Sequence, residues 1–290
     1  MTTGICRGVA LVIALGALGA LCAPGASALA QPAKGAPTAA RTKVGAKPVK
    51  ASAVAPELIA ALAGIDIEAA AKAAEMLGAN PAPVAHEALL DALALGLPAA
   101  VAAPAMLALG AHPAPPDVVA LRRYAGHHTP GVRIAALSTL AMYPDPAAHA
   151  VVVAGLHDPV GMVRTAAAGA AARGRIKAAI EPLLLLLAKG EDASARALAA
   201  LADPDLARKI ADQLGKVPDP TLAVTLGAIL KRADFGPDEA RVEIVRALAK
   251  IQDASAVTAL TDYLDSSPKL PPRPSRGEAQ MVVEARLGGK

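Results

Sequence analysis

The sequence LGANPAP at residues 77–83 decides the fold, because it returns twice with nearly the same chemistry. It reappears as LGAHPAP at 109–115, 32 residues later, and as LAMYPDP at 140–146 after a further 31. In each copy an alanine-rich segment ends and a pair of prolines prevents a helix from continuing. The repeat therefore predicts that one helix stops at each copy and that a second helix begins beyond it.

A second marker has the same spacing. VRIAA at 132–136 is matched by VRTAA at 163–167, 31 residues later, and ARVEI at 240–244 is predicted to occupy the same phase near the end of the repeats. Segments 150–156 and 256–264 place apolar residues at i, i+3, i+4 and i+7, which is the helical period. Because no segment of this region alternates like a strand, we predict an all-α fold.

Helix starts are predicted from Asp-Pro pairs. Each pair supplies an N-cap acceptor and a proline whose fixed φ suits the first helical position. They occur at 145–146, 158–159, 203–204 and 219–220, and LGKVPDP at 214–220 repeats the stop signal out of the strict period.

A helix pair of about 31 residues cannot bury its apolar face alone, so neighbouring pairs must stack. These motifs resemble the HEAT repeat family, in particular its short bacterial branch, which includes phycobilin lyase-type proteins. The resemblance covers residues 54–266. It implies an α-solenoid of about six antiparallel helix pairs, and it leaves the phase of the helices within 191–235 unassigned.

The first thirty residues predict a secretory signal peptide. Arg7 precedes an apolar run at 9–23, and Ala28-Leu29-Ala30 before Gln31 forms a small-x-small cleavage site. Cleavage after Ala30 predicts a periplasmic or secreted protein, and the alternative is a membrane-anchored form with the segment uncleaved. Both cysteines lie in this segment, so the mature chain has no thiol for disulfides or metal binding.

The remaining ends are poor in apolar periodicity. Residues 31–53 hold five basic residues and no acidic one, which favours a disordered Ala/Pro/Lys linker with weak attraction to membrane or wall polymers. Residues 267–290 are predicted to be a Pro-rich C-terminal tail, in which 281–287 form either a short terminal helix or no regular structure. The domains expected are thus 1–30, 31–53, 54–266 and 267–290.

Composition limits the ligands. Aromatic residues make up 1% of the chain, which disfavours cofactor pockets and base-stacking platforms. The net charge of +4 comes from the ends of the chain, so the folded part lacks the basic face that nucleic acid requires. We therefore expect a protein partner, no nucleic acid and no cofactor.

HEAT proteins often carry a ladder of one arginine and one aspartate per repeat. Arg133, Arg164 and Arg241 match the arginine position. The resemblance implies that each guanidinium bonds carbonyls or an aspartate of an adjacent turn, and an anion-binding row is the alternative.

The second helix of each pair lines the concave face in this family. The polar residues predicted there form the candidate partner-binding face, and a merely solvated surface is the alternative. They are Arg122, Arg123, Tyr124, His149, His157, Lys177, Glu181, Asp212, Thr258 and Asp262.

Metal and enzyme sites are disfavoured. Zinc needs three or four converging ligands, whereas the adjacent His127 and His128 point apart. The related deoxyhypusine hydroxylase binds iron through several His-Glu pairs, and here His86-Glu87 alone fits. We expect a non-enzymatic scaffold for protein–protein interaction, with a deoxyhypusine hydroxylase-like or phycobilin lyase-like enzyme, or a ligand or metal carrier, as the alternative.

Overall fold

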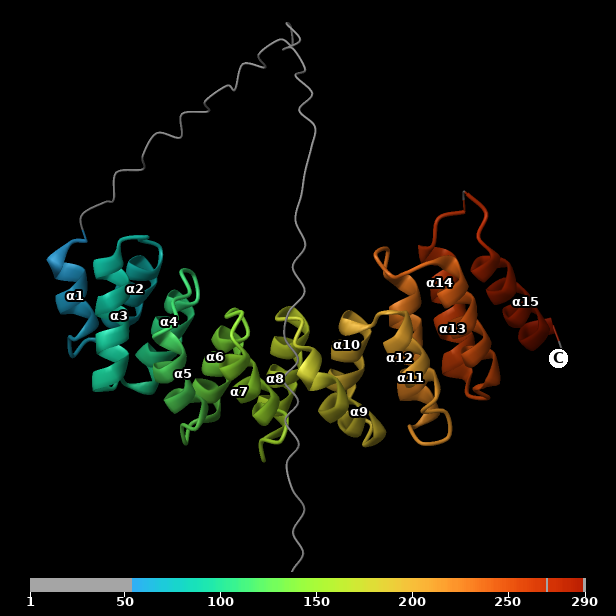
Figure 1. The fold of residues 1–290 in the computed structure, drawn as a ribbon, viewed down its shortest axis with the longest axis horizontal. Coiled ribbons are helices and arrows are strands. Elements are labelled where there is room, and N and C mark those ends of the chain that lie inside the picture. The colour runs from blue at the N-terminus through green and yellow to red at the C-terminus, as the bar shows by residue number, and fades with distance from the viewer. Residues whose placement is uncertain (1–53, 270, 289–290) are drawn as a thin grey trace, which may run out of the picture. The chain divides into compact units, whose positions relative to one another are not determined.

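The computed structural model describes residues 54–269 and 271–288. The predicted signal peptide and basic linker lie outside the described residues. Within them, fifteen α-helices and one 3₁₀ helix follow one another and no β-strand occurs, which confirms the all-α prediction (Figure 1).

The helices alternate between two layers. Helices of one layer pack against the next helix of the same layer and against their partner in a hairpin. The first-helix layer holds α1 (Pro56–Leu62), α3 (Pro83–Leu95), α5 (Asp117–Ala125), α7 (Pro146–Gly155), α9 (Ile180–Ala188), α11 (Pro204–Ala211), α13 (Asp238–Lys250) and α15 (Pro274–Gly288). The second-helix layer holds α2 (Ile67–Gly78), α4 (Ala99–Leu109), α6 (Pro130–Leu140), α8 (Gly161–Arg173), α10 (Asp192–Leu201), α12 (Asp219–Lys231) and α14 (Ala254–Ser266).

Several helix starts follow the predicted chemistry. The side chains of Asp145 and Asp203 accept backbone N–H groups at the starts of α7 and α11, with proline at the first helical position. The prediction is wrong at the other two pairs. Asp158 lies three residues before α8 begins and accepts the N–H of Val160, the N-cap of that helix. Asp219 is already inside α12, whose N-cap is Pro218.

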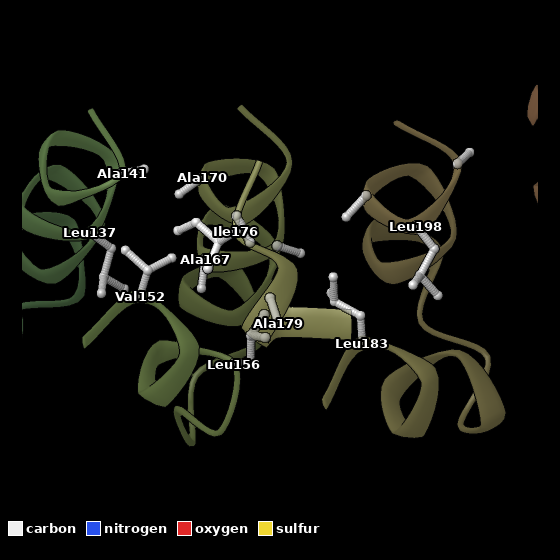
Figure 2. Packing of buried hydrophobic residues seen from close by; sticks show 14 of the residues in the cluster. Leu137, Ala141, Val152, Leu156, Ala167, Ala170, Ile176, Ala179, Leu183 and Leu198 are labelled. Carbon is white, nitrogen blue, oxygen red and sulfur yellow. The ribbon is translucent and has the colours of Figure 1, made fainter. Parts of the chain in front are cut away.

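The hydrophobic core runs between the two layers and continues from one hairpin to the next. In Figure 2, Leu137 of α6, Val152 of α7 and Ala167 of α8 meet in the interior, and Leu183 of α9 continues the same core toward Leu198 of α10. All five are at most 2% exposed. Because each hairpin covers the apolar face of its neighbour, stacking supplies the interior that one pair cannot form alone.

Close packing marks the second-helix layer. A Cβ placed on Gly78 of α2 would lie 2.5 Å from the Cβ of Ala108 on α4. Similarly, a Cβ on Gly227 of α12 would lie 2.7 Å from the Cβ of Ala259 on α14. Glycine facing alanine therefore lets successive second helices approach backbone to backbone.

The phase of the repeat differs from the prediction. The proline-pair motifs at 77–83, 109–115 and 140–146 separate one hairpin from the next instead of joining the two helices of a pair. The variant at 214–220 lies inside a hairpin, between α11 and α12. The same motif therefore serves both kinds of connection. A phase counted from the motif changes by one helix within 191–235 relative to the observed layers. Seven hairpins precede α15, whereas about six were expected.

The helical array extends past residue 266, which corrects the predicted C-terminal tail. Helix α15 packs against α13 and α14. Its Ser275 hydroxyl donates to Asp238 Oδ1 at 2.6 Å, and the Ser275 N–H donates to Asp238 Oδ2 at 2.9 Å. Arg286 donates to the carbonyls of Ala249 and Ile251 at the end of α13. These polar contacts compensate for the weak apolar periodicity that suggested a tail.

Candidate interaction surface

Grooves lie between successive helices of the first-helix layer. The groove between α5 and α7 has a volume of about 450 Å³, that between α11 and α13 about 430 Å³, and that between α1 and α3 about 330 Å³. Cavities of this size fall within the range that ligand sites occupy. The first-helix surface therefore offers room for a partner.

The groove between α5 and α7 is lined mainly by small side chains. Ala147, Ala150 and Ala154 form the α7 wall, and Leu137 of α6 also lines it. Arg122 and Asp158 add the charged groups of its lining. Alanine on the α7 surface leaves the space unfilled, so the groove arises directly from the composition of the helix.

A further cavity of about 370 Å³ lies where three connections between successive hairpins meet. They are the connections from α8 to α9, from α10 to α11 and from α12 to α13. Arg175, Lys177 and Arg232 bring positive charge, and Asp203 and Asp234 bring negative charge. Arg232 is fully engaged, because it bonds both oxygens of Asp234 and the carbonyls of Ala199 and Ala202.

Three of the predicted face residues line these spaces. Arg122 lies in the groove between α5 and α7, Asp212 in the groove between α11 and α13, and Lys177 in the cavity at the hairpin connections. All three are exposed. Their role in binding a partner stays a prediction.

Tyr124 is not available as a surface anchor. Its side chain is buried, and its hydroxyl donates to the carbonyl of Leu93 at 2.8 Å, thereby joining α5 to α3. The neighbouring Arg123 is exposed and donates to the carbonyl of Ala94 at 3.4 Å. The sequence predicted Tyr124 on the exposed face because α5 was assigned to the wrong layer. With that assignment, the side of α5 that faces the neighbouring hairpin could not be identified.

The remaining predicted face residues lie on both layers. His149 is half-buried on α7 and His157 is exposed just beyond it. Glu181 of α9 lies 3.8 Å from the ammonium group of Lys209 on α11. Thr258 and Asp262 lie on α14, in the second-helix layer. The ten residues therefore do not form one face. All three of α5, α7 and α14 were expected to be second helices, but α5 and α7 belong to the first-helix layer.

The predicted arginine ladder is likewise divided between layers. Arg133 of α6 and Arg164 of α8 lie in the second-helix layer, whereas Arg241 lies on α13 in the first-helix layer. The same phase shift accounts for this difference.

Arg133 of α6 joins its own hairpin to the connection between α7 and α8 in the next hairpin. It donates through Nε and Nη2 to both carboxylate oxygens of Asp158, each at 2.8 Å, and through Nη1 to the carbonyls of His127 and His128. Hydrogen bonding to this guanidinium lowers the pKa of Asp158 below its usual range. Arg164 donates through Nε to one carboxylate oxygen of Glu191, at 3.0 Å, and through Nη1 to the carbonyl of Asp158, at 2.9 Å.

Arg241 has a different environment. It is 4% exposed and donates to the carbonyls of Gly236 and Arg232, and its guanidinium lies 5.5 Å from the ring centroid of Phe235. Its Nε has no hydrogen-bond partner within the described part of the chain. Burial lowers its pKa from the ordinary arginine value.

A buried polar network was missed by the sequence reasoning. Asp117, at the start of α5, is fully buried and accepts from the N–H of Ala114 and from the Tyr143 hydroxyl, at 2.9 and 2.7 Å. His86 Nε2 of α3 lies 2.7 Å from its other oxygen. Burial, and then the bond to Asp117, raises the pKa of Tyr143 above its usual value. The sequence feature that could have indicated this network is the spacing of 31 residues between His86 and Asp117, which equals the length of one repeat.

Among residues 54–269 and 271–288, no group of three or more His, Cys, Asp or Glu side chains is arranged to hold a metal ion. In that same part of the chain, no helix combines the length and apolar character needed to cross a membrane.

Several solved structures are similar to this chain at low sequence identity. The complex of CpcE and CpcF of phycocyanin lyase from Nostoc sp. PCC7120 is 20% identical, with a TM-score of 0.43, over 89% of this chain and 99% of that one. A karyopherin bound to the extreme C-terminus of a protein phosphatase is 16% identical, with a TM-score of 0.44, over 80% of this chain and 30% of that one. An engineered protein is 21% identical, with a TM-score of 0.39, over 80% of this chain and 71% of that one.

No protein-family model matches the sequence, and no curated protein matches it. The fold is an all-α, HEAT-like array of stacked helix pairs, which rests on the arrangement of its own helices. Likeness at these identities and TM-scores says nothing about activity or partners.

Proposed function

We propose that this protein is an exported, non-enzymatic scaffold that binds another protein through its first-helix surface, in place of the concave second-helix face that was expected from the sequence. The observation that supports the proposal is the difference between the two layers. Second helices approach backbone to backbone at α2–α4 and at α12–α14, whereas grooves of about 330–450 Å³ lie between the first helices α1 and α3, α5 and α7, and α11 and α13. Export is proposed from the sequence of residues 1–30.

Site-specific photo-crosslinking in the bacterial envelope fraction tests the surface. A photoreactive residue replaces Ala150, which is exposed and lines the groove between α5 and α7. A matched control replaces Thr165, which is exposed on α8 in the second-helix layer. The proposal predicts one discrete protein adduct from position 150 and little from position 165. Adducts from position 165 alone, or from neither, would contradict it.

Two further measurements test the rest of the proposal. The mass of the mature N-terminus tests export, because cleavage after Ala30 leaves a chain that begins at Gln31. Metal analysis of the purified chain tests the non-enzymatic assignment, and stoichiometric iron or zinc would favour a metalloenzyme or a metal carrier instead.

A further inference from the structure

Negative charge is concentrated in the first three helices of the array. Residues 54–98 hold six acidic residues and one basic residue, a net charge of −5, whereas 99–288 hold 19 acidic and 21 basic residues. The acidic residues are Glu57, Asp66, Glu68, Glu75, Glu87 and Asp91, and the basic one is Lys72. The described array is therefore electrostatically polar, with an acidic region at α1–α3.

One of the grooves lies within this acidic region. The groove between α1 and α3 is walled on the α1 side by Ile59, Leu62 and Ala63. Its α3 wall is a stripe of one helix face, spaced i, i+3, i+4, i+7, i+8 and i+11, which consists of Val84, Glu87, Ala88, Asp91, Ala92 and Leu95. These nine lining residues include two carboxylates and no cation.

The groove is also unusually apolar for a solvent-facing surface. Leu95 is 89% exposed and Val84 is 54% exposed, and both lie on the α3 stripe. Glu87 and Asp91 lie between them, one helical turn apart, and both are exposed. The stripe thus alternates aliphatic and acidic groups along a helix of 13 residues, about 20 Å long.

We propose that the groove between α1 and α3 binds a basic amphipathic helix of a partner protein. Lysine or arginine side chains spaced i, i+4 on that helix would face Glu87 and Asp91, and its aliphatic side chains would pack on Val84 and Leu95. Straight apolar grooves along a helix are a common site for such segments. This inference rests on the proposed scaffold role and names the partner of one groove.

Other occupants fit the groove less well. A neutral apolar helix would remove the two carboxylates from water without supplying a partner for them, which is costly. A second copy of this chain in a symmetric contact would bring the same acidic stripe onto itself. A basic helix instead compensates both carboxylates while it covers the aliphatic groups.

Fluorescence anisotropy with designed peptides tests the proposal on the full chain. The probe is a labelled helical peptide of leucine and lysine with lysines at i, i+4 on its apolar face, and the matched probe carries glutamate in place of lysine. We expect the lysine peptide to bind, the glutamate peptide not to bind, and the affinity to fall at high salt. The double variant Glu87→Gln/Asp91→Asn should weaken binding about three- to tenfold.

A double variant with the same change in charge provides the control. Glu68→Gln/Glu75→Gln removes two exposed carboxylates from α2, in the other layer of the same region, and should leave the affinity within about twofold. Equal weakening by both double variants would overturn the proposal in favour of diffuse attraction to the acidic region, and so would absence of binding. Because position 150 lies in a different groove, crosslinking there would still support the scaffold role if the peptide fails to bind.

Discussion

The two layers of the array use different interactions to join one repeat to the next. In the second-helix layer, Gly78 faces Ala108 and Gly227 faces Ala259, so helices meet through their backbones. In the first-helix layer, polar side chains reach across the gap, as in the Tyr124 hydroxyl on the Leu93 carbonyl. Small residues therefore let second helices approach closely, while in the first-helix layer grooves remain between three pairs of helices.

The largest expected effect comes from removing the central polar link of the first-helix layer. Asp117→Ala leaves the Tyr143 hydroxyl, His86 Nε2 and the Ala114 N–H without their acceptor in a buried site. Leaving a buried hydrogen-bonding group without its partner costs about 1–3 kcal/mol for each group, which chemical denaturation measures as a lower free energy of unfolding.

The control for this variant is Asp212→Ala, at an exposed position of the same layer. It should change the free energy of unfolding by no more than about 0.5 kcal/mol. A similarly small effect of Asp117→Ala would show that the first helices are held together by packing alone.

A smaller effect is expected from a single methyl group in the second-helix layer. Gly78→Ala would place its Cβ 2.5 Å from the Cβ and 2.7 Å from the Cα of Ala108, and the backbone of α4 would have to move. Overpacking of this kind costs about 1–3 kcal/mol.

Gly131→Ala in α6 is the matched variant, because a Cβ there meets nothing within 4 Å. The change should stabilise the protein by about 0.4–1 kcal/mol, since alanine restricts the unfolded chain. Urea denaturation of both variants tests the contrast, and equal effects would show that the second helices are not in close contact.

Sequence periodicity was sufficient to predict the helical array but not its phase. The 31-residue spacing of VRIAA and VRTAA identified α6 and α8 as equivalent helices. The LGKVPDP variant left the phase within 191–235 unassigned, because a proline pair stops any helix and carries no information about which layer comes next. The expectation that ARVEI at 240–244 keeps the phase of VRIAA was therefore wrong. Tyr124 and Asp117 show the same limit. Whether a polar side chain faces solvent or the neighbouring repeat depends on that phase, and the sequence of one repeat does not encode it.

The smallest expected effect concerns pH and the connection between hairpins. Arg133 lowers the pKa of Asp158, so the folded state holds this carboxylate ionised more strongly than the unfolded state does. The pair therefore contributes fully above the ordinary aspartate pKa, about 3.9, and its contribution is lost as pH falls through the lower folded value. Asp158→Asn should have a lower Tm than the unaltered chain at neutral pH.

Thermal unfolding as a function of pH tests this prediction. The difference in Tm between the two proteins should shrink as pH falls below about 4. A difference that stays constant down to strongly acidic pH would show that the ionised pair with Arg133 does not join the hairpins.

Backbone amide hydrogen exchange tests most directly whether the second-helix layer is the close-packed one. In each internal hairpin, the amides of the second helix, such as α4, α6 and α8, should exchange more slowly than those of its partner, α3, α5 and α7. Slow exchange in a helix reports how tightly its surroundings resist opening. Equal protection of the two layers, or slower exchange in the first helices, would contradict the account.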